Sequence, residues 1–203
     1  MIELKSNLTT SPGVCSVKIA ENLVIRSAES PAEIEQLREL FLEYAASLNF
    51  PLCFQNFDQE LATLPGKYSP PAGVLLIVFC GGSLAGCGAL RPLPVTPADT
   101  TTAPVGNPEN QRACEMKRLY LRPAFRGQGI GRVIAERLIS EAKRIGYTLM
   151  RLDTIPTQMP EANRLYHSLG FYETSAYYDN PHLDATYMEL PLAAVAKAKT
   201  PTS

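Results

Sequence analysis

The chain has 203 residues, 45% of them hydrophobic and 19% charged, which is typical of one soluble globular domain. Its 19 basic and 20 acidic residues give a formal net charge of -1, whereas nucleic-acid-binding domains usually carry a basic excess or a basic stripe. We therefore expect no nucleic-acid partner.

Cysteine and histidine usage argues against a metal site. The five cysteines have no C-x-x-C pair, and only two histidines accompany them: Cys15, Cys53, Cys80, Cys87, Cys114, His167 and His182. The expectation is reduced core thiols in a cytoplasmic protein. The longest apolar run, residues 74–80, is too short to cross a membrane, and residues 1–10 lack the apolar core of a signal peptide.

The first half of the chain predicts a strand, two helices and a hairpin. A strand is expected over residues 23–28. Ser30, Pro31 and Glu33 then form a capping-box pattern at the start of a long amphipathic helix. A short helix is expected over residues 58–64. Two apolar runs joined by glycines predict a hairpin of strands 74–80 and 84–90.

Residues 92–108 are rich in proline and threonine. Proline lacks a backbone donor, so this segment is expected to lie outside the sheet interior. We interpret it as a mobile loop, with a role as a lid over a ligand site still open.

The second half alternates strands and helices. Strands are expected over residues 114–121, 149–154, 171–176 and 185–190, with helices over 129–145 and 160–169. The order predicts a mixed α/β domain with at least one strand–helix–strand crossover. One domain is expected over residues 1–192, followed by a flexible tail over 193–203.

The most informative segment is the glycine-rich turn that leads into the helix at 129–145. Gly127, Gly129 and Gly131 alternate there, and Arg126 and Arg132 flank them. A helix N-terminus reached through glycines can bind a phosphate or pyrophosphate, although a tight turn without a ligand has the same appearance. The Gly-x-Gly-x-x-Gly spacing of a dinucleotide fold is absent.

Here the sequence resembles the GNAT N-acetyltransferases. Arg126-x-x-Gly129-x-Gly131 matches the family's acetyl-CoA signature, preceded by Glu115 and by Leu119-Tyr120-Leu121-x-Pro123. Downstream, Ala162-Asn163-x-x-Tyr166-x-x-x-Gly170-Phe171 resembles the family's second cofactor motif. The resemblance implies a mixed, mostly antiparallel twisted sheet flanked by helices. It also implies transfer of an acetyl group from acetyl-CoA to an acceptor, expected to be an amine, by direct attack.

The resemblance also implies which residues bind acetyl-CoA. The strand would pair with the pantetheine arm through Leu119, Tyr120 and Leu121. Asn163 would reach the same arm, and Tyr166 would lie near the sulfur. The pyrophosphate would lie on the backbone of Arg126, Gly127, Gln128, Gly129, Ile130, Gly131 and Arg132.

Two residues are candidates for catalysis. Glu115 is either the general base, acting through water, or the partner of a neighbouring cation such as Arg91 or Lys117. Tyr166 is either the acid that protonates the leaving thiolate or a packed core tyrosine. The aromatic and polar residues 177–182 form either part of the acceptor pocket or an ordinary turn.

The sequence leaves several matters open. A non-catalytic domain that binds acyl-CoA as a sensor or scaffold would carry the same glycine turn. The acceptor, the length of the acyl group and the formation of a homodimer are not specified by the sequence.

Overall fold

The fold is built from seven β-strands and four α-helices within residues 22–48, 52, 56–94, 112–182 and 184–192, which are the residues that the computed structural model describes. The strands are β1 (Leu23–Ser27), β2 (Val74–Cys80), β3 (Ser83–Leu93), β4 (Ala113–Leu121), β5 (Leu149–Thr154), β6 (Tyr172–Thr174) and β7 (Thr186–Pro191). The helices are α1 (Pro31–Ser47), α2 (Phe57–Ala62), α3 (Ile130–Ile145) and α4 (Pro160–Ser168), with the short 3-10 helices η2 (Gly66–Tyr68) and η5 (Pro123–Phe125).

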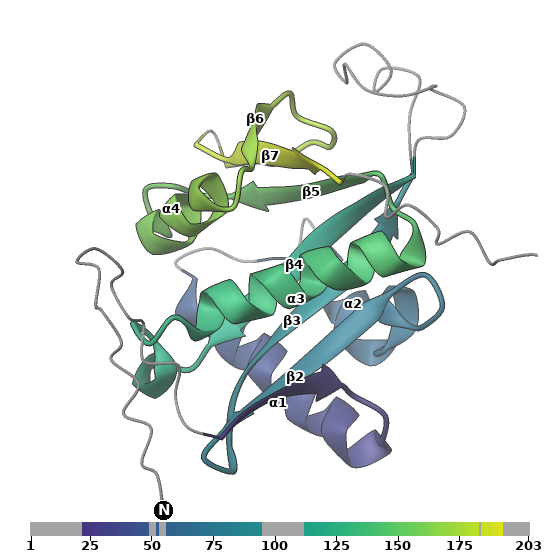
Figure 1. The fold of residues 1–203 in the computed structure, drawn as a ribbon, viewed down its shortest axis with the longest axis vertical. Coiled ribbons are helices and arrows are strands. Elements are labelled where there is room, and N and C mark those ends of the chain that lie inside the picture. The colour runs from purple at the N-terminus through teal and green to yellow at the C-terminus, as the bar shows by residue number, and fades with distance from the viewer. Residues whose placement is uncertain (1–21, 49–51, 53–55, 95–111, 183, 193–203) are drawn as a thin grey trace, which may run out of the picture.

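The strands form one sheet in the order β1-β2-β3-β4-β5-β7-β6 (Figure 1). All neighbouring strands are antiparallel except β4 and β5, which are parallel and are connected through α3. The predicted fold class and the strand–helix–strand crossover are confirmed. Residues 193–203 lie outside the described part of the chain, so the domain division at 192 stays a prediction.

The start of α1 has the capping box that the sequence predicts. The backbone N–H of Glu33 donates to the Ser30 hydroxyl at 3.3 Å, and the Glu33 carboxylate accepts from the backbone N–H of Ser30 at 3.1 Å. Pro31 occupies the first turn, where its missing N–H leaves no internal bond unmade. These contacts fix the position at which the chain leaves β1 and begins to cover the sheet.

Two apolar cores lie on opposite faces of the sheet. On one face, α3 and α4 cover residues such as Met116 and Met150, while α1 and α2 cover Leu75 and Ile77 on the other (Figure 1). Cys87 and Cys114 are buried free thiols, as expected, and burial raises the pKa of both. Cys15 and Cys53 lie outside the described residues.

Pro92 corrects one expectation, because it lies within β3 and pairs with Cys114 of β4. Pairing of β3 with β2 ends at Leu90↔Val74, so β3 has only β4 beside it at Pro92 within the described residues. The missing N–H therefore interrupts no two-sided ladder. Residues 95–111, which make up most of the expected loop, lie outside the described residues, and the lid role stays a prediction.

Candidate active site

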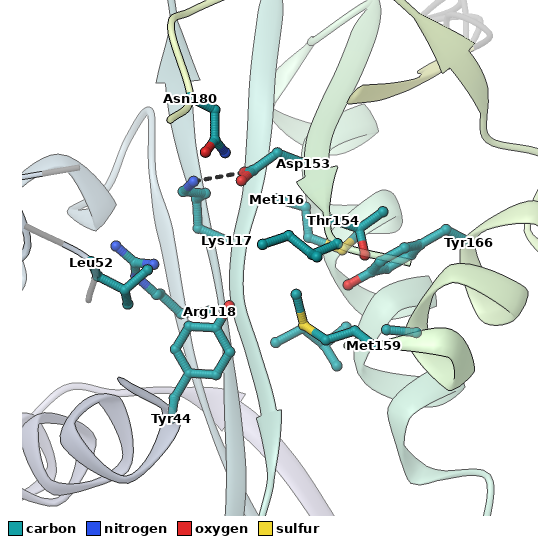
Figure 2. A pocket seen from close by; sticks show the side chains of 13 residues that line it. Tyr44, Leu52, Met116, Lys117, Arg118, Asp153, Thr154, Met159, Tyr166 and Asn180 are labelled. Carbon is teal, nitrogen blue, oxygen red and sulfur yellow. Dashed lines mark hydrogen bonds and ion pairs between the residues drawn. The ribbon is translucent and has the colours of Figure 1, made fainter. Parts of the chain in front are cut away.

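An opening between β4 and β5 forms the centre of the site. The two strands pair only from Ala113↔Leu149 to Glu115↔Arg151 and then diverge. A cavity of about 50 Å³ lies in this opening (Figure 2). Strands β4 and β5, helices α1 and α4, and nearby loops supply its lining: Tyr44, Leu52, Met116, Lys117, Arg118, Leu119, Asp153, Thr154, Ile155, Met159, Ala162, Tyr166 and Asn180.

A β-bulge in β4 shapes the opening. Cys87 pairs with Tyr120 and Ala89 with Lys117, so two residues of β4 lie opposite one residue of β3. Arg118, in the bulge, has a left-handed φ of 55°. Because a bulge bends its strand and increases the local twist, β4 turns where it leaves β5. Leu119, predicted to contact the pantetheine arm, consequently lies in the cavity lining.

Tyr166 enters this cavity from α4, and Figure 2 shows its hydroxyl pointing inward beside Thr154. The side chain is buried, and its ring meets Phe171 edge to face at 5.9 Å. Burial raises the pKa of Tyr166, and the nearby groups Tyr44 and Asp153 raise it further. The hydroxyl is therefore protonated near neutral pH and available as a donor.

Two buried oxygens near Tyr166 have no hydrogen-bond partner among the described residues. They are Oγ1 of Thr154, in the cavity lining, and Oδ1 of Asn163, one turn before Tyr166 on α4. Buried polar atoms in folded proteins normally have a partner, so the unpaired Oγ1 of Thr154 at the cavity indicates a ligand or water there. An amide-containing chain lying between β4 and α4 would provide such partners.

The glycine turn has the geometry of an anion site. Gly127 and Gly129 have φ values of 74° and 78°, and no side chain caps the start of α3 at Gly129. The N–H of Arg126 donates to Pro123 and that of Arg132 to Gly129, whereas no described residue accepts from the N–H groups between them. The N–H groups available to a pyrophosphate thus belong to residues 127–131.

The side chains at this turn have other partners. Arg126 Nε donates to the Leu121 carbonyl at 2.9 Å, and Gln128 donates to the Ala124 carbonyl at 3.1 Å. Arg132 pairs with Glu136 at 3.3 Å. Tyr120, predicted to contact the cofactor, packs into the core under α1, so its backbone rather than its ring is on the β4 edge.

Glu115 lies apart from the small cavity. Its carboxylate is fully buried, 2.6 Å from Arg91 and 3.6 Å from Lys117, and it accepts a hydrogen bond from the Tyr177 hydroxyl at 2.9 Å. Of the two roles left open by the sequence, this geometry favours the ion pair. Glu115 does not line the small cavity, and its role as general base stays a prediction.

Glu115 belongs to a row of alternating charges across four strands. Arg91 of β3 pairs with Glu115 of β4, Glu115 with Arg151 of β5, and Arg151 with Glu189 of β7. The Arg151–Glu189 ion pair is 3.2 Å long and almost fully buried. Buried charges are tolerated when each has an opposite partner, and this register provides one for every member of the row.

Lys117 and Asp153 form a second pair, 2.9 Å apart, beside the first row (Figure 2). Burial alone would raise the pKa of Asp153, but the charge and hydrogen bond of Lys117 outweigh it and lower the pKa. Sequence reasoning missed this pair and the Arg151–Glu189 pair. Two spacings in the sequence, Glu115-x-Lys117 and Arg151-x-Asp153, could have indicated these ion pairs. Each puts two charges on one face of a buried strand.

A larger cavity, of about 490 Å³, shares one lining residue, Lys117, with the small one. Residues of α2, η2, β3, β4 and the 177–182 turn surround it: Asn56, Gln59, Glu60, Thr63, Pro65, Gly66, Lys67, Tyr68, Arg91, Lys117 and Tyr178. The 177–182 turn contributes Tyr178 here and Asn180 to the small cavity. This supports its interpretation as a part of the site.

Neither a metal cluster nor a membrane span is found in the described part of the chain. No three His, Cys, Asp or Glu residues there are grouped so that they could hold a metal ion. No helix there is long and apolar enough to cross a membrane.

Residues 34–171 match the family model described as the Acetyltransferase (GNAT) family. An uncharacterized N-acetyltransferase of Schizosaccharomyces pombe is 36% identical over 173 residues, covering 85% of this chain and 96% of its own length. A second uncharacterized N-acetyltransferase, from Dictyostelium discoideum, is 33% identical over 216 residues and is matched over 84% of this chain and 100% of its own length.

A solved acetyltransferase from Salmonella typhimurium, whose structure contains its cofactor acetyl-CoA, shares the fold with a TM-score of 0.57. It is 23% identical and covers 90% of this chain and 99% of its own. The glycine turn, the opening between β4 and β5 and these matches agree with one another. The chain belongs to the GNAT family and is an N-acetyltransferase.

Proposed function

We propose that the enzyme holds acetyl-CoA in the opening between β4 and β5 and transfers the acetyl group directly to an amine. The observation that carries this proposal is the inward-pointing Tyr166 hydroxyl beside Thr154, whose buried Oγ1 has no hydrogen-bond partner among the described residues. Acetyl-CoA supplies the thioester. The chain supplies its backbone donors at 127–131, the free edge of β4 at 119–121, and the side chain of Asn163.

Tyr166 is proposed to donate its hydroxyl proton to the sulfur as the thiolate leaves. Its raised pKa keeps the hydroxyl protonated, so it remains a hydrogen-bond donor to the sulfur as negative charge develops there. No cysteine is required in this direct transfer, which agrees with the burial of Cys87 and Cys114.

The acceptor is proposed to enter through the larger cavity, because this cavity and the small one have Lys117 in both linings. Glu115 is then proposed to be a positioning residue, since it holds Arg91 and Lys117, both of which line the larger cavity. Cytoplasmic localisation and the absence of a metal are also part of this proposal.

A thiol-release assay tests the proposal. Acetyl-CoA is offered with a panel of amines, amino acids and peptides, and CoA binding is measured in parallel by calorimetry. Thiol release that depends on one acceptor class supports it. Tight CoA binding without release for any acceptor would favour the acyl-CoA sensor, and propionyl-CoA in the same assay tests whether the acyl group is longer than acetyl.

A further inference from the structure

The ion pairs beside the larger cavity are oriented with their positive ends toward it. Arg91 and Lys117 line this cavity, whereas their carboxylate partners do not. Glu115, the partner of Arg91, is fully buried beneath it, and Asp153, the partner of Lys117, lines the smaller cavity. A molecule in the larger cavity therefore meets the cations before it meets their counter-ions.

Lys67 adds a third cation to the lining. It lies exposed in η2, and the described residues give it no ion pair. The one carboxylate in the lining, Glu60, is already bound twice by Arg118, at 2.8 Å and 2.6 Å, and by the Tyr68 hydroxyl at 2.9 Å. The lining thus contains three cations and one carboxylate, which gives it a net positive charge.

Arg91 retains donors for a ligand. Its Nε and Nη2 atoms contact Oε2 of Glu115, at 2.7 Å and 2.6 Å, which fixes the plane of the guanidinium. A guanidinium has five N–H donors, and within the described residues the Nη1 side and one N–H of Nη2 have no hydrogen-bond partner, which leaves them for an anion. Such a fixed guanidinium suits a carboxylate, which accepts two parallel hydrogen bonds.

We infer that the acceptor is a small amine that carries a carboxylate, with the chemistry of an amino acid. The inference rests on the proposed function, since it assigns the acceptor of the same site. The volume of about 490 Å³ is that of a small-molecule pocket, and the side-chain amides of Asn56 and Gln59 in its lining suit a polar ligand. The N-terminus of a protein lacks a carboxylate close to its amine, which disfavours a protein acceptor.

The experiment compares matched acceptors in the thiol-release assay. The twenty common L-amino acids are offered with acetyl-CoA, each beside its carboxamide and its decarboxylated amine, together with short peptides amidated at the C-terminus. We expect kcat/KM for the best amino acid to exceed that of its carboxamide by about 10- to 100-fold, the range for hydrogen bonds to a charged group. Equal values for acid and carboxamide, or better turnover of the amidated peptides, would overturn the inference while leaving acetyl transfer intact.

Two variants then assign the effect to the cavity. Lys67→Gln alters an exposed side chain, and Arg91→Lys keeps a cation beside buried Glu115, so both variants are expected to fold. Each should reduce the preference for the acid over the carboxamide, about 3-fold for Lys67→Gln and about 10-fold for Arg91→Lys, through a higher KM for the acid. Lys143→Gln on α3, which lines neither cavity, is the matched control and should change nothing.

An unchanged preference in both variants would also overturn the inference. If no acceptor of any class releases thiol although CoA binds, the proposed function fails first, and the acceptor assignment fails with it. The two failures are thus distinguishable.

Discussion

Arg118 Nη2 lies 2.6 Å from Oε2 of Glu60, with only 2% and 11% of the two side chains exposed. The pair connects the bulge of β4 to α2, and the Arg118 guanidinium also lies over the Phe57 ring at 5.2 Å. Helix α2 has only six residues and could not hold its position through its own hydrogen bonds. The wall of the larger cavity therefore depends on this ion pair.

Glu60→Gln should cost stability and weaken acceptor binding. Removing one partner leaves Arg118 as a buried charge without its counter-ion, which typically costs about 3–5 kcal/mol. We expect a lower urea midpoint and a raised KM for the acceptor, with the KM for acetyl-CoA little changed. Glu161→Gln, which breaks the exposed pair with Arg164, is the matched control and should leave the midpoint unaltered.

A fall in pH should lower the free energy of unfolding of the wild type more than that of the Glu60→Gln variant. Burial raises the pKa of Glu60, but the hydrogen bonds and charge of Arg118 outweigh this and lower it. The stabilisation is complete above the unfolded pKa of about 4.3 and is lost as the pH falls through the folded pKa. The difference in unfolding free energy between the two proteins should thus shrink below about pH 4; a constant difference down to pH 2 would contradict the lowered pKa.

Tyr166→Phe keeps the ring against Phe171 and removes only the hydroxyl. If the hydroxyl protonates the leaving thiolate, kcat should fall about 100-fold while CoA affinity and melting temperature stay close to the wild type. The thiol-release assay measures kcat, and titration and scanning calorimetry on the same preparation measure the CoA affinity and the melting temperature. Near-normal turnover in a stable variant would remove Tyr166 from the mechanism.

Gly129→Val should abolish CoA binding. Gly129 has a φ of 78°, which a β-branched side chain does not tolerate, and it caps the helix whose N–H groups are proposed to bind the pyrophosphate. Gly82→Val is the matched control, because Gly82 has a φ of 80° but lies in the β2–β3 turn. Both variants should lose stability, and calorimetry should show lost affinity for Gly129→Val alone.

Glu115→Gln separates the two roles of this residue. If Glu115 acts only as an ion-pair partner, the Glu115→Gln variant should be less stable than the wild type. Its kcat should stay within about 10-fold of the wild-type value. A fall of about 100-fold in kcat, with loss of the acidic limb of the pH–rate profile, would instead identify Glu115 as the general base.

Local patterns predicted the helices and most strand bounds well. The capping residues Ser30 and Glu33 act within one turn, and the strand at 149–154 was predicted with its observed bounds, Leu149–Thr154. Gly129 and Tyr166 could be proposed as site residues because their motifs are short in sequence. Each of these features depends on residues that are close along the chain.

Features that depend on strand register were not predictable. The bulge at Arg118 exists only relative to Gly88 of the neighbouring strand, and Pro92 is tolerated because β2 begins at Val74, opposite Leu90, and does not reach Pro92. The contact of Glu60 with Arg118 spans 58 positions. A local sequence pattern does not specify how two distant strands align, and these contacts depend on that alignment.

The row of alternating charges also constrains how the sheet assembles. If β5 slipped by one residue against β4, Arg151 would turn into the apolar core under α3. If it slipped by two, Asp153 would lie opposite Glu115, and two carboxylates would face each other without water. Glu115, Arg151 and Asp153 therefore disfavour both misalignments of the central strands, so buried charges beside the cavities also favour the correct strand register during folding.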